Sequence, residues 1–136
     1  MAARLQRRRT KDWRTPIDDL GRKAVYVGRG SRWGNPWRLV RHADGTHGVV
    51  NDALDTRTTH PTETSARAAA AAEYETWLAT PNTLVAVRHA CEHSIIRQDL
   101  GLLHGRDLLC WCPLPAAGEP DHCHGAVLLA LANAPR

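Results

Sequence analysis

The chain carries three of its four cysteines near the C-terminus, at Cys110, Cys112 and Cys123, and His122 and His124 flank the last of them. Thiolate sulfur and imidazole nitrogen can bind a metal ion or, in the case of histidine, move a proton near neutral pH. An apolar run ends in the first two cysteines, and a loop rich in proline and glycine leads to the third. These five residues therefore meet at a strand-to-helix junction, where open α/β folds usually bind ligands.

Two interpretations of this junction stay open. In one, Cys110, Cys112, Cys123 and His124 bind zinc, although the spacing lacks paired C-x-x-C motifs and a strand residue does not easily share a metal with its i+2 neighbour. In the other, which the spacing favours, no metal or other cofactor is needed. Cys110 is then a small buried residue, while Cys123 and His124 line a pocket. Because free N–H groups at a helix start favour a thiolate, we expect Cys123 to react faster than Cys110 or Cys91.

A second group of candidate residues lies in the loop GRGSRWGNPW. Its glycines allow backbone amides to approach a phosphate, arginine can grip that phosphate with two hydrogen bonds, and tryptophan can stack on a base. The alternative is a turn-rich loop whose tryptophans fill the core. The predicted substrate-binding residues are Gly28, Arg29, Gly30, Arg32, Trp33, Asn35 and Trp37, with Cys112 across the cleft.

The predicted catalytic residues are Cys123, His124 and Glu73, the last because a helix carboxylate could reach the cleft. The alternative for Glu73 is a solvated position on the helix surface, and the same two interpretations stay open for Arg67. The other histidines show no ligand spacing and are predicted to lie at the surface, whereas Cys91 is predicted to be part of the core. These histidines are His42, His47, His60, His89, His93 and His104.

The elements that position these residues follow from local patterns. Short apolar runs predict strands at 23–27 and 107–112, the second central and covered on both faces. The pair Asp44-Gly45 predicts a hairpin between 36–41 and 46–50, and the polar segment 51–61 is predicted to be a loop. Helical spacing predicts a helix over 66–78, a second marked by Leu84, Val87, Cys91 and Ile95, and a closing helix over 123–133. Together they predict a small single-domain α/β layered fold with a mixed sheet flanked by helices.

The net charge of +4 is concentrated at the N-terminus. Residues 1–14 hold six basic side chains and one acidic one, so the rest of the chain has a balance of −1. We therefore predict a basic, flexible arm over 1–20, able to contact nucleic acid through phosphate charge, and a single domain over 21–136. The chain shows no apolar run of membrane-spanning length and no signal peptide, which predicts a cytoplasmic protein without a membrane partner.

Three segments carry a resemblance to a known family. The motifs VYVGRGSRWGNPW, EYETWL and LHGRDLLCWCPL followed by CHGAVLLALAN resemble the domain-of-unknown-function family 4326 of bacteria and phages, and they span most of residues 24–133. The resemblance implies that the glycine-arginine loop and both cysteine motifs are family features, and it implies no activity. The family pattern C-H-x-D has Ala126 at its last position here. If that aspartate is catalytic in relatives, this chain lacks the activity or recruits Asp121 or Glu119.

These observations predict a small enzyme, a hydrolase or transferase, that acts on a nucleotide or nucleoside by hydrolysing or exchanging an N-glycosidic bond. Arg29 and Arg32 would hold the phosphate, Trp33 or Trp37 would stack on the base, and His124 or Glu73 would handle protons. The alternative is a non-catalytic module that binds nucleotide or nucleic acid, with zinc bracing the cysteine-rich junction.

Overall fold

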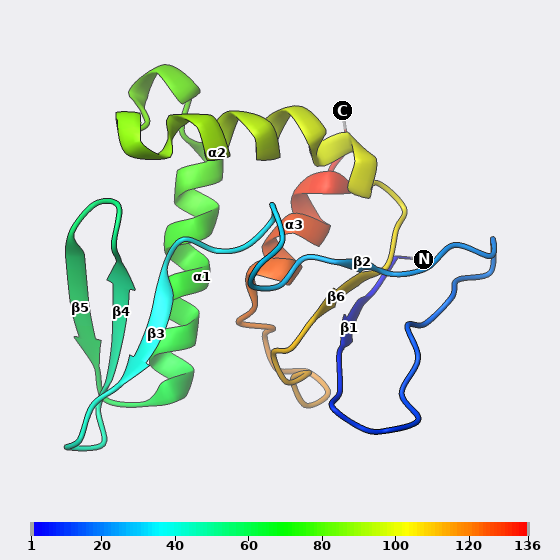
Figure 1. Cartoon of the computed structure of the whole chain (residues 1–136), viewed down its shortest axis with the longest axis horizontal. Coiled ribbons are helices and arrows are strands. Elements are labelled where there is room, and N and C mark those ends of the chain that lie inside the picture. Colours follow the sequence, from blue (N-terminus) through cyan, green and yellow to red (C-terminus); the bar gives the residue numbers. More distant parts are fainter. Residues whose placement is uncertain (1, 136) are drawn as a thin grey trace.

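The computed structural model describes residues 2–135, which form two three-stranded sheets and three α-helices (Figure 1). One sheet is parallel, with the order β1-β6-β2, and the other is antiparallel, with the order β3-β4-β5. The predicted α/β class is confirmed, but the parallel and antiparallel pairings belong to separate sheets. Within the described residues, no helix is long and apolar enough to cross a membrane.

The parallel sheet is built around β6 (Leu108–Cys110), which lies between β1 (Arg4–Gln6) and β2 (Val25–Tyr26). All three residues of β6 are buried, as its unbroken apolar sequence predicts for a central parallel strand. The predicted arm over 1–20 is therefore partly an element of the domain, since β1 pairs with β6 along its whole length. The sequence gives no sign of this because β1 is short and its partner lies about a hundred residues away.

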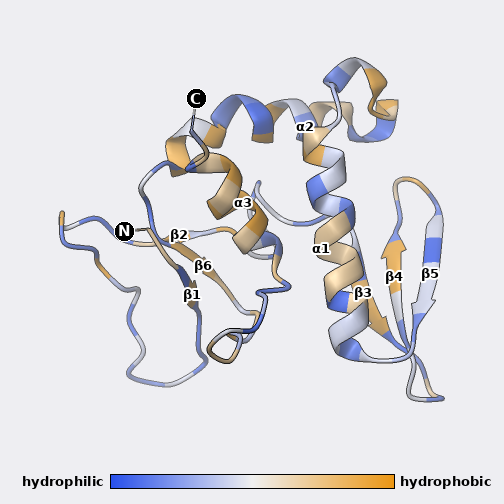
Figure 2. Ribbon diagram, turned by 180° about the vertical axis from the view of Figure 1, so that it is seen from behind, coloured by the Kyte–Doolittle hydropathy of each residue, from blue (hydrophilic) through white to orange (hydrophobic). Residues whose placement is uncertain are grey.

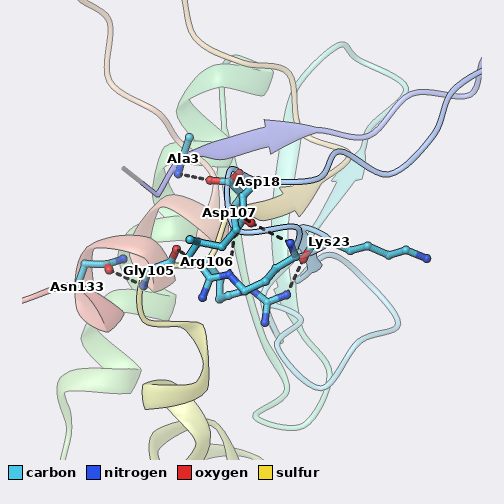
Figure 3. Close-up of polar contacts among 9 residues, drawn as sticks. Ala3, Asp18, Lys23, Gly105, Arg106, Asp107 and Asn133 are labelled. Carbon is cyan, nitrogen blue, oxygen red and sulfur yellow. Dashed lines mark hydrogen bonds and ion pairs between the residues drawn. The ribbon is translucent and has the colours of Figure 1, made fainter.

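Side chains and backbone at the amino end of β6 tie these strands together (Figure 3). An Asp107 carboxylate oxygen accepts a hydrogen bond from the Ala3 backbone N–H at 2.9 Å. The Arg106 guanidinium donates to the Lys23 carbonyl at 2.5 Å, and the Gly105 N–H donates to the Asn133 side chain at 2.9 Å. The turn before β6 thus fixes the starts of both flanking strands and the end of the last helix.

The antiparallel sheet begins with the predicted hairpin of β3 (Arg38–Arg41) and β4 (His47–Asn51). Gly45 adopts a φ of 89° in the turn, where a glycine avoids the strain of a side chain. The segment predicted to be a loop instead contains β5 (Thr56–His60), an edge strand paired with β4. Its residues are largely exposed, so β5 lacks the apolar alternation by which a strand is recognised.

The first helix, α1 (Glu63–Ala79), lies between the antiparallel sheet on one side and α3 (His124–Ala132) on the other (Figures 1 and 2). Thr62 caps α1, and its hydroxyl and the Ser65 hydroxyl each accept a hydrogen bond from the other residue's backbone N–H. In turn, α3 packs on β1 and β6 of the parallel sheet. The predicted helical spacing is confirmed by the buried residues of α1, which are Ala66, Ala70, Ala71, Tyr74, Trp77 and Leu78.

The second helix, α2 (Val87–Asp99), exists as predicted but buries a different face. Short 3-10 turns at Asn82–Leu84 and Leu100–Leu103 flank it. Two residues predicted to face inward, Val87 and Cys91, are exposed. The buried residues of α2 are His89, His93 and Ile96.

Polar and aromatic partners explain why α2 buries histidines that were predicted to lie at the surface. The two ring nitrogens of His93 hydrogen-bond to the Trp77 carbonyl at 2.9 Å and to the Asn82 side-chain amide at 3.1 Å. His89 packs edge-on against the rings of Trp37 and Trp77, with centroid distances of 5.8 and 5.2 Å. These partners come from outside α2, so its own sequence could not reveal them.

Candidate functional site

The three cysteines of the C-terminal motif meet at the carboxyl end of β6. The sulfur atoms of Cys110, Cys112 and Cys123 all lie within 4.8 Å of one another, and the distance from Cys110 to Cys112 is 3.7 Å. All three are free thiols; Cys110 and Cys123 are buried, and Cys112 is half-buried. The structure therefore assembles a cluster of three sulfur ligands, which we call the thiol cluster.

The backbone after β6 explains how residues two apart can share this cluster. Neighbouring side chains at i and i+2 of a continuous strand point the same way but stay about 7 Å apart along the chain. Here the strand ends at Cys110 and the chain bends at Trp111 and Cys112. The bend returns the Cys112 sulfur toward Cys110, so the separation expected for i and i+2 residues of a continuous strand does not apply to this pair.

Arg4 of β1 holds the loop that carries Cys112. Its guanidinium is buried, donates to the carbonyl oxygens of Cys112 at 3.0 Å and Pro113 at 2.8 Å, and forms an ion pair with Asp121. One side chain thus joins the start of the loop between Cys112 and Cys123 to its end. Asp121, a possible replacement for the missing family aspartate, is committed to this pair, and Glu119 is exposed.

Cys123 is the N-cap of α3, and its sulfur accepts a hydrogen bond from the Gly125 backbone N–H at 3.3 Å. Hydrogen bonds with Cys110 and then with Cys112, followed by burial, nevertheless raise the pKa of Cys123. Thiol donation, first from Cys112 and then from Cys123, lowers the pKa of Cys110. Cys110, predicted to be only a small buried residue, is therefore the cluster's preferred thiolate, and Cys123 is not.

His124 does not belong to the thiol cluster. Its Nε2 atom lies 2.6 Å from the Val27 carbonyl oxygen, to which it donates, and its ring packs edge-on against Tyr74 at a centroid distance of 5.4 Å. The ring is buried. His124 thus links the start of α3 to the end of β2 and to α1.

A cavity of about 280 Å³ opens over the thiol cluster. It is bordered by three arginines from three elements: Arg29 from the loop after β2, Arg38 from β3 and Arg67 from α1. No carboxylate lines it among the described residues. Arg38 was not predicted, because a single arginine on a strand carries no motif, and the sequence left two interpretations open for Arg67 on its helix. His122 and Trp111 also line the cavity; the sequence placed His122 at the junction, but neither residue was predicted to have a role in the site.

The predicted substrate-binding residues divide between this cavity and other places. Arg29, Asn35, Trp37 and Cys112 line the cavity, as do the predicted catalytic residues Cys123 and His124. Asn35 is held by hydrogen bonds, because its amide nitrogen donates to the Ala70 carbonyl at 3.0 Å and its amide oxygen accepts from the Trp37 N–H at 2.9 Å.

The remaining predicted residues do not line the cavity. Trp33 is buried in the core and its carbonyl accepts a hydrogen bond from Tyr74, so it is not free to stack on a base. Arg32 pairs with Asp99 at 2.7 Å. Gly30 and Arg32 border a neighbouring pocket, which Arg29 and Asn35 also line.

Gly28 and Glu73 also lie outside the cavity lining, Gly28 against the Tyr26 ring and Glu73 on the exposed surface of α1. A Cβ atom on Gly28 would lie 2.6 Å from the Tyr26 hydroxyl oxygen, so the glycine is required by packing against that ring. Glu73 is exposed on α1 and does not border the cavity. The alternative interpretation of Glu73 as a solvated helix residue therefore describes its position.

Fold and site together define a small α/β domain with a cavity at the carboxyl end of its parallel sheet. Three cysteines and three arginines line this cavity. The chain belongs to the family described as Domain of unknown function (DUF4326), whose model matches residues 5–134. The match covers all three helices, every residue of the cavity and both sheets except Arg4, the first residue of β1. No curated protein and no solved structure shows significant similarity to the chain.

Proposed function

We propose that this protein is a small enzyme that binds a nucleotide or nucleoside phosphate in the cavity above the thiol cluster. The observation that carries the proposal is the gathering of Arg29, Arg38 and Arg67 around one cavity whose described lining has no carboxylate. Guanidinium groups bind phosphate oxygens in pairs, and such charge-assisted hydrogen bonds are stronger than neutral ones. An anionic ligand of the phosphate class fits this lining.

The three arginines differ in whether they form ion pairs, and this difference indicates which of them can bind a phosphate. Arg38 is paired with Asp52 at 2.9 Å and Arg67 with Glu63 at 2.7 Å, so both are held in place by exposed carboxylates. The Arg29 side chain forms no ion pair within residues 2–135. Arg29 is therefore the residue free to turn toward a phosphate.

The cavity volume limits the ligand. Ligand pockets commonly measure about 300–1,000 Å³, so a cavity of about 280 Å³ suits a single nucleoside unit rather than a longer chain. The rings of Trp37 and Trp111 border it and offer apolar surface for a base. Trp111 is half-buried, whereas Trp37 is buried like Trp33, so the stacking surface in this proposal comes mainly from Trp111.

In this proposal, His122 is the residue that transfers protons. His122 lines the cavity and is half-buried, whereas the His124 Nε2 atom is engaged with a carbonyl and Glu73 lies outside. Imidazole can give and take a proton near neutral pH. Hydrolysis or exchange of an N-glycosidic bond remains the proposed reaction, with His122 as its general acid.

Calorimetric titration with nucleoside monophosphates and the matching nucleosides tests the binding. Arg29→Ala is expected to weaken monophosphate binding by about 1.5–3 kcal/mol, the value of a hydrogen bond to a charged group. Arg32→Ala is the matched control, because Arg32 belongs to the same loop but pairs with Asp99. Equal affinity of the wild type and Arg29→Ala for every monophosphate would refute the proposal.

A second function, nucleic-acid binding, is favoured by the N-terminal segment. The guanidinium carbons of Arg7 and Arg9 lie 5.0 and 4.8 Å from the ring centroid of Trp111, which borders the cavity. Basic residues next to an aromatic ring are typical of single-strand binding surfaces. Binding of a short single-stranded oligonucleotide that weakens with salt and with Arg9→Ala, but not with Arg29→Ala, would support this function.

A further inference from the structure

We propose that Cys110, Cys112 and Cys123 bind one zinc ion, with the fourth coordination position open to the cavity. This inference concerns a metal centre and does not depend on the proposed nucleotide function. Three thiols that converge on one point from two separate segments are the central observation. Thiolate is a preferred zinc ligand, and zinc sites with three protein ligands keep the fourth position for water or substrate.

The sulfur positions fit a tetrahedral ion. A Zn–S bond of about 2.3 Å at tetrahedral angles places two sulfur ligands about 3.8 Å apart. The sulfurs of Cys110 and Cys112 are 3.7 Å apart, and each lies within 4.8 Å of the Cys123 sulfur. A disulfide would require about 2.05 Å, and an odd number of thiols always leaves one unpaired.

The surroundings of the cluster hold the ligands in place as an outer shell does in metal proteins. The Gly125 N–H donates to the Cys123 sulfur. A Cβ atom on Gly125 would lie 3.2 Å from the Arg4 side chain and 3.5 Å from that sulfur, so a larger residue would crowd the cluster. Arg4 fixes the carbonyl of Cys112 and adds a buried positive charge next to the cluster.

The fourth coordination position is assigned to the cavity because no fourth protein ligand lies near the three sulfurs in the described residues. In the described part of the chain, no further histidine, cysteine or carboxylate ligand atom joins the group within the same limit. His124 is turned toward the Val27 carbonyl. All three cysteines line the cavity, so an ion bound there would be reached from solvent through it. The open position therefore faces the space in which Arg29, Arg38 and Arg67 gather.

Metal content of the full-length protein tests the inference. The purified chain is reduced, loaded with zinc and desalted. The number of zinc ions per chain is then measured by inductively coupled plasma mass spectrometry. We expect about one zinc per chain in the wild type and in Cys91→Ser, since Cys91 is exposed on α2. Cys112→Ser and Cys110→Ser should hold less than about a tenth of that amount, because each removes one of three protein ligands.

Cobalt loading and folding controls complete the experiment. The cobalt-loaded wild type should show thiolate-to-metal charge-transfer absorption, and Cys112→Ser, whose side chain is only half-buried, should lose it while its circular dichroism is unchanged. Wild-type protein without bound zinc after loading under reducing conditions would overturn the inference, as would full zinc binding by Cys112→Ser. Calorimetry with nucleoside monophosphate on the same samples separates the two proposals, because either binding event can fail while the other is observed.

Discussion

The buried guanidinium of Arg4 and the carboxylate of Asp121 form an ion pair that joins the first strand of the domain to the loop before the last helix. The Arg4 side chain is 3% exposed and the Asp121 side chain 21%. A short strand within a basic N-terminal segment is thereby tied to the loop that separates Cys112 from Cys123. Loss of this pair should therefore affect both the stability of the fold and the thiol cluster.

Asp121→Asn should lower the free energy of unfolding by about 1.5–3 kcal/mol, because it leaves a buried guanidinium without its charged partner. Chemical denaturation monitored by circular dichroism measures this change. Asp52→Asn is the control, since it breaks the Arg38–Asp52 pair, in which the Asp52 side chain is 71% exposed. Exposed pairs contribute about 0–1 kcal/mol. Equal effects of the two variants would contradict the structural role of Arg4.

Tyr74→Phe should destabilise the fold by about 1–3 kcal/mol. The Tyr74 hydroxyl donates to the Trp33 carbonyl at 2.8 Å in the core, and its removal leaves that carbonyl buried without a partner. Burial also raises the pKa of Tyr74, so the group stays a neutral donor. Tyr26→Phe removes a hydrogen bond of the same length at the surface and should cost less than about 0.5 kcal/mol. Thermal and denaturant unfolding of both variants measures the two losses of stability and shows which is larger.

The stability of the protein should decrease as the medium becomes mildly acidic because of His89. Burial lowers the pKa of His89, and this effect exceeds the opposing one of Glu92. A histidine whose folded pKa is lowered contributes stability above its unfolded pKa of about 6.5, and that contribution is lost as the pH falls through the folded pKa. The free energy of unfolding, measured by denaturation between about pH 7.5 and 5, should fall more steeply in the wild type than in His89→Phe.

The control for this pH dependence is His47→Gln, a half-buried position on β4 outside the aromatic cluster. It should keep the wild-type pH dependence. If His89→Phe also kept the full slope, protonation of another group would be its cause.

Alkylation of the native protein should modify Cys91 first and Cys123 last. Cys91 is exposed, Cys112 half-buried and Cys123 1% exposed, and a thiol must be reached before its ionisation matters. This order replaces the one expected from the helix start alone, in which Cys123 reacts before Cys91. Brief reaction with iodoacetamide followed by peptide mass spectrometry ranks the four residues. Rapid labelling of Cys123 in the folded protein would contradict the burial seen here.

Local sequence determined the elements whose signals lie within a few residues. The capping pair of Thr62 and Ser65 and the apolar spacing of α1 require no distant partner, and the same is true of the turn at Asp44-Gly45. The unbroken apolar run of β6 was enough to predict a central strand. The fold class followed from these elements.

Only the tertiary structure decided which residues meet. Strand β1 forms because β6 offers it hydrogen bonds from a distant part of the chain, and α2 buries His93 because Trp77 and Asn82 satisfy its ring. The chain bend after Cys110 brings three thiols together, and three separate elements bring three arginines to one cavity. Such contacts depend on long-range partners that satisfy buried polar groups, and a local pattern of residues does not contain them.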